Sequence, residues 1–309
     1  MTQNIGRRDR EKEARPFKRK WLAQCFGISK QAFYKRLKSQ KAKEYNESIV
    51  LKLVKECRNK VGHQTGGKKL YDYLKKDLEL NNIKLGRDRL FNILRDNRLL
   101  VRKTKQYHVT TNSKHYFYKY KNLVKDKVPT RPEQLWVTDI TYIKTQHGHN
   151  YLALVTDAYS KKIMGYKLDN NMRTELCLDA LKMALKNRKY PNQKLIHHSD
   201  RGIQYCNPMY TEFAEKNGLQ LSMTEQYDPY QNAVAERINK TLKYEYGLKN
   251  NIKNTQIAQK MTKKAIFIYN YLRKHWSLDF ETPNHVHLNK NKPYKSYRKN
   301  KKQLEFLTI

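Results

Sequence analysis

Three acidic residues have a type and a setting that could support chemistry on a phosphodiester. Asp139 lies in the middle of the β-rich run WVTDITYI, Asp200 ends LIHHSD, and Glu236 lies in QNAVAERINKTLKYEY. An acid inside a strand must lose water from its charge, and this costs free energy unless the carboxylate has a partner. Taken singly, each acid is explained better by a salt bridge or by a charge on a helix surface.

Taken together, the three acids indicate a metal site. The chain has 65 Lys and Arg against 28 Asp and Glu, and carboxylates brought together would repel one another unless a cation lay between them. Oxygen ligands suit Mg²⁺ or Mn²⁺. Two such ions can activate an attacking oxygen and stabilise the leaving oxygen of a phosphodiester.

Alternating strands and helices must position these acids. We expect strands at residues 136–143, 151–158, 163–168, 194–199 and 219–224, and helices at 174–187, 208–217 and 231–246. Three strands in a meander, followed by helix and strand in alternation, is the order of an α/β, ribonuclease-H-like core with a mixed five-stranded sheet and flanking helices. We assign this core to residues 132–250, with Asp139 and Asp200 on separate strands.

An all-α region is expected ahead of the core, at residues 21–100, after a basic lead-in at 1–20. Residues 21–37 fit two short helices, with Gly27 at the turn and Ser29 as the N-cap of the second. This pattern fits a DNA-binding helix-turn-helix and a plain helical hairpin equally well. The outward side of the second helix would carry Lys30, Gln31, Tyr34, Lys35 and Arg36. Three further apolar stripes between residues 46 and 100 fit either a DNA-binding domain or an ordinary three-helix bundle.

The remaining segments are a linker, a C-terminal helix and a tail. Residues 101–131 interleave bases with aromatics and are expected to form a basic linker lying along a phosphate backbone. Residues 251–287 include an amphipathic helix with Ile257, Met261, Ala265, Ile268 and Leu272 in register. Residues 288–309 form a basic tail.

The net charge of +37 predicts a polyanionic partner, either nucleic acid or an anionic membrane surface. An AT-biased coding sequence would also enrich lysine, and explains part of this charge. No apolar stretch approaches the roughly 18–20 residues of a membrane span, and the N-terminus has no apolar signal core, so we expect a cytoplasmic protein. The four cysteines are far apart and have no zinc-finger spacing, which disfavours disulfides and zinc.

Four motifs occur in an order that resembles a known family. They are WVTDITYI around Asp139, HHSDRGIQY around Asp200, QNAVAERINKTLKYE around Glu236, and YNYLRKHWSLDFETP at residues 269–283. This series is similar to the DDE recombinase superfamily, specifically the retroviral-integrase-like transposases of bacterial insertion-sequence family three and their downstream-frame protein. The resemblance covers residues 21–287.

The resemblance implies a polynucleotidyl transferase in which Asp139, Asp200 and Glu236 bind two Mg²⁺ or Mn²⁺ ions. Lys243 stands where the family keeps a basic residue seven positions after its glutamate, on nearly the same helix face. We expect it to contact DNA together with Asn239 and Lys240. The implied partners are double-stranded DNA, further copies of the chain on that DNA, and an upstream-frame protein, and the implied location is the bacterial nucleoid.

The sequence differs from the family pattern at two places, and two other functions are also considered. Gln231–Asn232 replaces a common Asp-Asn pair, and Lys274 replaces a usual proline. A catalytically silent DNA-binding relic or regulator would keep the fold, but the three acids and Lys243 are all present. A ribonuclease-H-type nuclease would share the core, but not the N-terminal helices or the C-terminal block.

Overall fold

The computed structural model describes residues 27–101, 116–125, 127–225, 233–289 and 304–305. The chain forms two compact units, residues 1–53 and 54–309. In the first unit, helix α2 (Lys30–Val61) begins where the sequence predicted a helix, because the Ser29 hydroxyl accepts the Ala32 N–H at 3.1 Å. The helix does not end near Leu37. Residues 38–45 hold good helix formers and neither glycine nor proline, so nothing interrupts it.

The second unit begins with the last turns of α2, followed by α3 (Gly67–Leu80) and α4 (Arg87–Asp96). Glycine precedes both of the shorter helices, as Gly66 before α3 and Gly86 before α4. Their apolar stripes are buried, with Leu70, Leu74 and Leu78 in α3 and Leu90, Ile93 and Leu94 in α4. Arg58 of α2 closes this helical group by donating to the Leu99 carbonyl at 2.7 Å.

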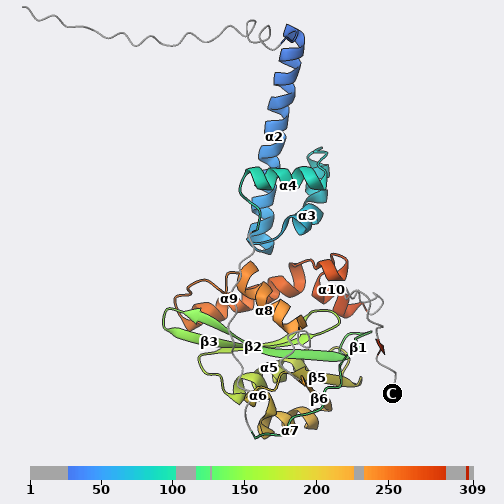
Figure 1. Cartoon of the computed structure of the whole chain (residues 1–309), viewed down its shortest axis with the longest axis vertical. Helices are drawn as coiled ribbons and strands as arrows, with labels where there is room; N and C mark the ends of the chain where they lie inside the picture. Colours follow the sequence, from blue (N-terminus) through green and yellow to red (C-terminus); the bar gives the residue numbers. More distant parts are fainter. Residues whose placement is uncertain (1–26, 102–115, 126, 226–232, 290–303, 306–309) are drawn as a thin grey trace, which may run out of the picture. The chain divides into compact units, whose positions relative to one another are not determined.

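A five-stranded sheet forms the centre of the second unit (Figure 1). Its strands are β2 (Leu135–Thr145), β3 (Gly148–Asp157), β4 (Ile163–Asp169), β5 (Leu195–Ser199) and β6 (Leu219–Met223), in the order β4-β3-β2-β5-β6. The β4-β3-β2 part is antiparallel, and β2-β5-β6 is parallel. The predicted mixed ribonuclease-H-like sheet is therefore confirmed.

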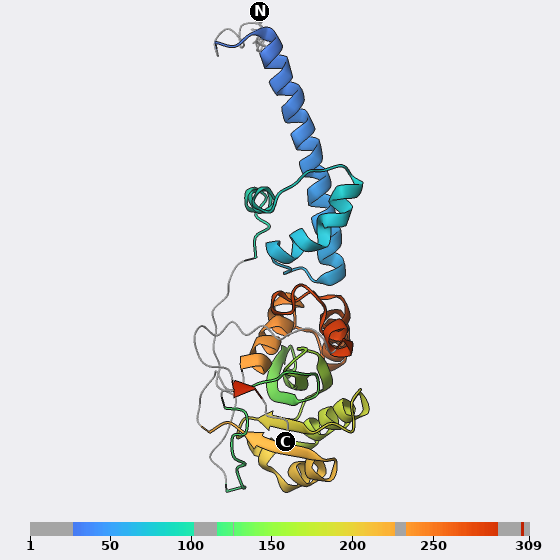
Figure 2. The same ribbon diagram turned by 90° about the vertical axis from the view of Figure 1, so that its right-hand side faces the viewer.

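Helices cover both faces of the sheet, as the two views in Figure 1 and Figure 2 show. Helix α5 (Thr174–Lys186) lies on one face with α6 (Ile203–Cys206) and α7 (Pro208–Lys216), while α8 (Ala233–Glu245) and α9 (Thr255–Phe267) lie on the other. Strand β3 serves both cores because its side chains alternate. Ala153 and Val155 pack on the α5 side, and Leu152 and Leu154 pack on the α8 side.

Close packing of α5 depends on one glycine of β4. A Cβ built on Gly165 would overlap the Ala180 carbonyl and would lie 2.6 Å from the Ala184 nitrogen, both in the backbone of α5. Only a residue without a side chain lets the helix approach the strand this closely.

The C-terminal block continues α9 as a π-helical turn, η1 (Ile268–Leu272), followed by η2 (Trp276–Leu278) and α10 (Pro283–Leu288). It docks on α3 through Lys274, whose ammonium lies 2.7 Å from Asp72. The Lys274 backbone N–H also donates to the Tyr73 hydroxyl at 2.6 Å, and that hydroxyl donates to the Leu272 carbonyl at 2.7 Å. Proline has no N–H, so a proline at position 274 could not make this contact.

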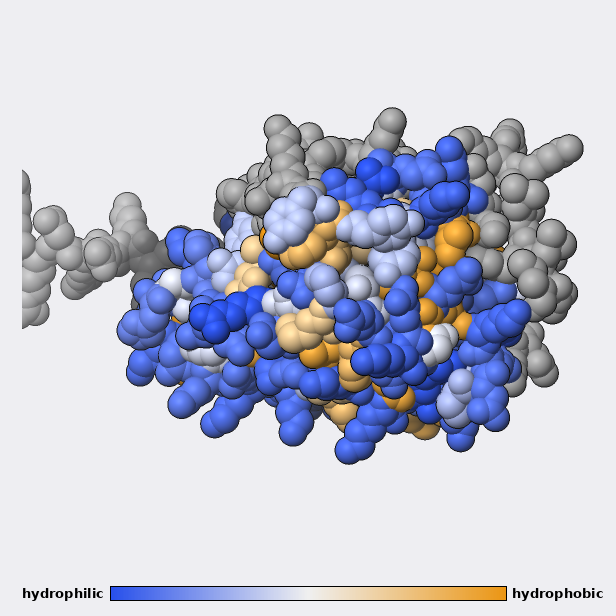
Figure 3. Space-filling model, turned by 90° about the horizontal axis from the view of Figure 1, so that it is seen from below, coloured by the Kyte–Doolittle hydropathy of each residue, from blue (hydrophilic) through white to orange (hydrophobic). Residues whose placement is uncertain are grey.

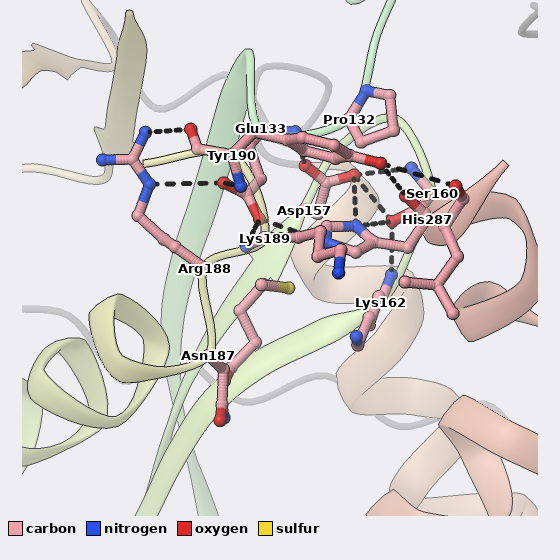
Figure 4. A network of polar contacts seen from close by, with 12 residues as sticks. Pro132, Glu133, Asp157, Ser160, Lys162, Asn187, Arg188, Lys189, Tyr190 and His287 are labelled. Atoms are coloured by element: carbon pink, nitrogen blue, oxygen red, sulfur yellow. Dashed lines mark hydrogen bonds and ion pairs between the residues drawn. The ribbon is translucent and has the colours of Figure 1, made fainter. Parts of the chain in front are cut away.

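A buried polar network ties α10 to the sheet (Figure 4). The Asp157 carboxylate accepts hydrogen bonds from the Ser160 hydroxyl and from the Glu133 N–H, each at 2.7 Å. His287 of α10 lies between the two acids, 3.2 Å from Glu133 and 3.9 Å from Asp157. Arg188 adds an ion pair to Glu133 at 3.2 Å. Asp157 is thus held mainly by hydrogen bonds and by His287.

Part of the predicted basic linker is packed on the core. Phe117 and Tyr120 lie against the α5-side core, and the Tyr120 hydroxyl donates to Glu215 of α7 at 2.8 Å. Two short strands, β1 (Lys127–Val128) and β7 (Leu304–Glu305), pair in parallel.

The face seen in Figure 3 is mostly hydrophilic, with hydrophobic residues in small separate patches. In the described part of the chain, no helix is long and apolar enough to cross a membrane.

Candidate active site

Asp139 and Asp200 meet where two central strands separate. Strands β2 and β5 run parallel, and their last paired residues are Val137 and His198. Each acid follows two residues later, so both lie just beyond the end of the pairing. In sheets of this kind, ligands bind at the point where the strand order switches direction, because the strands diverge there and leave room.

The surroundings of Asp139 disfavour its ionised form. Its pKa is raised from 3.8 to about 8, mainly by burial and then by the nearby charges of Asp200 and Glu236. The Asn239 amide donates to Asp139 Oδ2 at 2.7 Å, which favours the ionised form but does not outweigh the burial. Asp200 and Glu236 therefore both lie within electrostatic reach of Asp139, and we refer to the three acids below as the acidic site.

Helix α8 brings Glu236 to this site. Ile238 and Leu242 are buried against the sheet, and the adjacent side of the helix, which carries Asn239, faces Asp139. Glu236 pairs with Lys240, one turn later, at 3.7 Å. Gly202 donates its backbone N–H to Asp200 Oδ1 at 3.0 Å.

The acidic site has the type of ligand that a divalent metal requires, but its ligands are not close together. Three carboxylates supply the oxygen ligands that Mg²⁺ and Mn²⁺ prefer. The pKa of Asp139 is raised, so a bound cation would stabilise its ionised form. Among the described residues, however, no three His, Cys, Asp or Glu side chains are gathered closely enough to hold an ion.

Two residues of α8 beside the acids occupy different environments. Asn239, predicted to contact DNA, is only 6% exposed and faces Asp139. Lys243 is half-buried, and its ammonium lies 4.2 Å from the centre of the Tyr142 ring. Burial lowers the pKa of Lys243, whereas Asp139 raises it. Their DNA contacts, and those of the exposed Lys240, remain predictions.

A buried ion cluster fixes the C-terminal end of α8. Glu245 accepts two hydrogen bonds from the Arg273 guanidinium, at 2.7 and 2.8 Å, and lies 3.4 Å from Lys69 of α3. Burial and the neighbouring Arg273 lower the pKa of Lys69 to about 8. No pattern in the sequence indicates this cluster, because its members lie up to 204 positions apart.

The other predicted site residues lie outside this region or outside the described residues. Lys30, Gln31, Tyr34, Lys35 and Arg36 are all exposed on α2, as predicted, in the first unit. The first helix of the proposed helix-turn-helix and the Gln231–Asn232 pair fall outside the described residues. His197 and His198 are buried and structural, with hydrogen bonds to Tyr210 and Ser222. Burial lowers the pKa of both histidines.

Comparison with known proteins points to one family. Residues 129–229 and residues 217–283 each match an integrase core domain. A 31 kDa protein of insertion element IS600 from Shigella sonnei is 34% identical over 264 residues, which cover 85% of this chain and 96% of the relative. The transposase of IS3A from Escherichia coli is 38% identical over 123 residues, and these cover 40% of this chain and 42% of that protein.

Among solved structures, the catalytic core domain of HTLV-2 integrase in complex with magnesium is similar to this chain. The match has 17% sequence identity and a TM-score of 0.40, and covers 51% of this chain and 97% of that domain.

Proposed function

Because the chain belongs to the insertion-sequence transposases that carry an integrase core domain, we propose that it binds the ends of its element and cuts and joins DNA there. The chemistry would take place at the acidic site. Asp139 carries this proposal, since it is an acid with a pKa of about 8 that adjoins two further acids in a chain of net charge +37.

The acidic site would hold divalent metal through Asp139, Asp200 and Glu236. When bound, Mg²⁺ or Mn²⁺ would supply positive charge that favours the ionised oxygens of a reacting phosphodiester. Asn239 would orient Asp139 through their 2.7 Å hydrogen bond. Lys243 and Lys240 would place positive charge beside the phosphate, on the helix that carries Glu236.

The reaction would proceed in two steps without a covalent bond to protein. In the first, a water oxygen attacks the phosphorus at the element's 3′ end and the strand leaves with a free 3′-hydroxyl. In the second, that hydroxyl attacks a phosphodiester of the target, so one bond forms as another breaks. A side-chain nucleophile is not required, in contrast to recombinases that use serine or tyrosine.

Further partners follow from the family. We propose that the chain acts as a homo-oligomer on DNA, with an upstream-frame partner protein, in the bacterial cytoplasm and associated with the nucleoid. Exposed Lys30, Gln31, Tyr34, Lys35 and Arg36 would contribute to binding of the terminal repeats. If six to ten phosphates are neutralised, affinity should fall roughly 10³–10⁵-fold between 50 and 200 mM salt.

One observation favours a second function. Lys240 lies 3.7 Å from Glu236, so one acid already has a protein cation as its partner, an arrangement that a DNA-binding protein without turnover would also have. Purified protein with Mg²⁺ should be offered duplexes of the element ends and, separately, RNA–DNA hybrids. Nicking and joining of the duplexes supports the transposase. Binding without cleavage supports the silent protein, and cleavage of hybrids alone supports a ribonuclease.

A further inference from the structure

The chain reverses immediately after helix α8, and this turn places a second lysine beside Lys243. The Lys249 N–H donates to the Lys243 carbonyl at 3.0 Å, which closes the turn over the helix end. Gly247 has a φ of +74°, a conformation that side-chain-bearing residues rarely adopt. Glycine at this position therefore allows the two lysines to be neighbours.

The turn is anchored rather than free. Leu248 and Ile252 are buried in the core between the sheet and α8. Ile252 also pairs with Thr145 at the end of β2, and its carbonyl accepts the Gln146 N–H at 2.9 Å. The segment that carries Lys249 is thus fixed to the hairpin that follows Asp139.

Each lysine lies over a tyrosine ring. The Lys243 ammonium is 4.2 Å from the centre of the Tyr142 ring, and the Lys249 ammonium is 4.7 Å from that of Tyr244. Such contacts hold a cation in place by electrostatic attraction to the ring face. Tyr142 is in turn packed edge-on against His149, at 5.5 Å between ring centres.

The two lysines are close enough for their charges to interact. Lys243 and Lys249 repel each other enough to lower the pKa of Lys243, beyond the lowering caused by burial. Asp139 acts in the opposite direction, and its effect on the pKa of Lys243 is larger than that of Lys249. An anion beside both ammonium groups would remove the repulsion, and successive phosphates of a nucleic-acid strand present such anions at regular spacing.

We infer that Lys243 and Lys249, held by Tyr142 and Tyr244, form a clamp for two phosphates of the DNA strand that reaches the acidic site. The inference rests on the proposed function, and it adds Lys249 as a DNA-binding residue and the two tyrosines as positioning residues. Tyr142 would act only through Lys243, and Tyr244 only through Lys249.

The salt dependence of DNA binding tests the clamp without requiring catalysis. The full chain is titrated, in EDTA, with a fluorescent DNA duplex taken from the end of its element. Loss of one phosphate contact lowers the slope of log affinity against log salt by about 0.9. From about 50 to 200 mM salt, Lys249→Gln should therefore lose roughly 3.5-fold less affinity than the wild type does. Lys260→Gln makes an equal change of charge at an exposed position of α9, and this control should keep the wild-type slope.

The tyrosines are tested by substitutions that keep or remove the ring. Tyr244→Phe and Tyr142→Phe retain the ring face and should bind as the wild type does. Tyr244→Leu and Tyr142→Leu should weaken binding by about two- to fivefold at low salt. Equal thermal unfolding midpoints for the Leu and Phe variants confirm that folding is not the cause.

Two results would overturn the clamp: a wild-type slope for Lys249→Gln, or equal binding by the Leu and Phe variants. Strand joining is measured separately, with Mg²⁺. If Lys249→Gln shows the lower slope but the wild type joins no strands, the clamp is supported and the proposed catalysis is refuted. If the wild type joins strands but Lys249→Gln keeps the wild-type slope, the catalysis is supported and the clamp is refuted.

Discussion

Replacing Glu245 by glutamine should destabilise the protein more than removing either cation that faces it. The carboxylate is shared by Arg273, through two hydrogen bonds, and by Lys69 at 3.4 Å. Glu245→Gln would leave two cations together in a largely buried site. Removing one member of a buried pair costs about 3–5 kcal/mol, and since the Glu245 side chain is 22% exposed, we expect about 3 kcal/mol.

Arg273→Met should cost less, because Lys69 remains to pair with Glu245. The double variant Glu245→Gln/Arg273→Met should be more stable than Glu245→Gln alone, since it removes the unpaired guanidinium. Thermal unfolding of the full chain measures all three. We expect Glu245→Gln to lower the midpoint by roughly 6–12 °C.

The pH dependence of this loss follows from Lys69. The pKa of Lys69 is already lowered to about 8, and losing Glu245 would lower it further. A lowered lysine pKa means that the folded state binds fewer protons than the unfolded state, so stability rises with pH in this range. The deficit of Glu245→Gln should therefore be larger at about pH 6 than at about pH 9. An Arg273→Met variant as unstable as Glu245→Gln, or a double variant less stable than it, would refute this reasoning.

Three other substitutions test the packing that supports the site. Gly165→Ala should destabilise by about 3 kcal/mol or more in urea unfolding, because its Cβ would collide with the backbone of α5; wild-type stability would contradict this packing. Burial opposes charging of His287, but its contacts with two buried acids prevail and raise its pKa, so His287→Gln should lose more stability at about pH 6 than at about pH 9, and an equal loss at both would exclude the ion pairs. Lys274→Pro should lower the unfolding midpoint by removing the N–H donated to Tyr73, whereas Lys274→Ala keeps that donor and serves as the control.

The sheet could be predicted from the sequence because local pattern determines it. Runs such as WVTDITYI and YLALVTDA combine β-branched and aromatic residues, and helices on both faces leave few of their side chains exposed. The orientation of α8 could also be predicted from the sequence, because the apolar residues Ile238 and Leu242 are one turn apart. An acid in the middle of such a strand was the signal that singled out Asp139.

What could not be predicted depends on contacts between distant parts of the chain. Lys69 and Glu245 are 176 residues apart, and no periodicity connects a lysine of one helix with a glutamate of another. The buried position of His287 likewise depends on Glu133, which precedes β2, and on Asp157 at the end of β3. Lys249 carries no sequence signal of its own, because only the turn at Gly247 brings it beside Lys243.

Strand joining by an acid variant tests the central claim most directly. Wild type, Asp139→Asn and Asp179→Asn are compared with Mg²⁺ and duplexes of the element ends; Asp179 is an acid on the outer surface of α5, 41% exposed. Because the pKa of Asp139 is raised, its charge disfavours folding at neutral pH, so Asp139→Asn should be at least as stable as the wild type without metal.

We predict that wild type and Asp179→Asn join strands, and that Asp139→Asn binds the same DNA but joins none. Undiminished joining by Asp139→Asn would contradict the assignment of the acidic site.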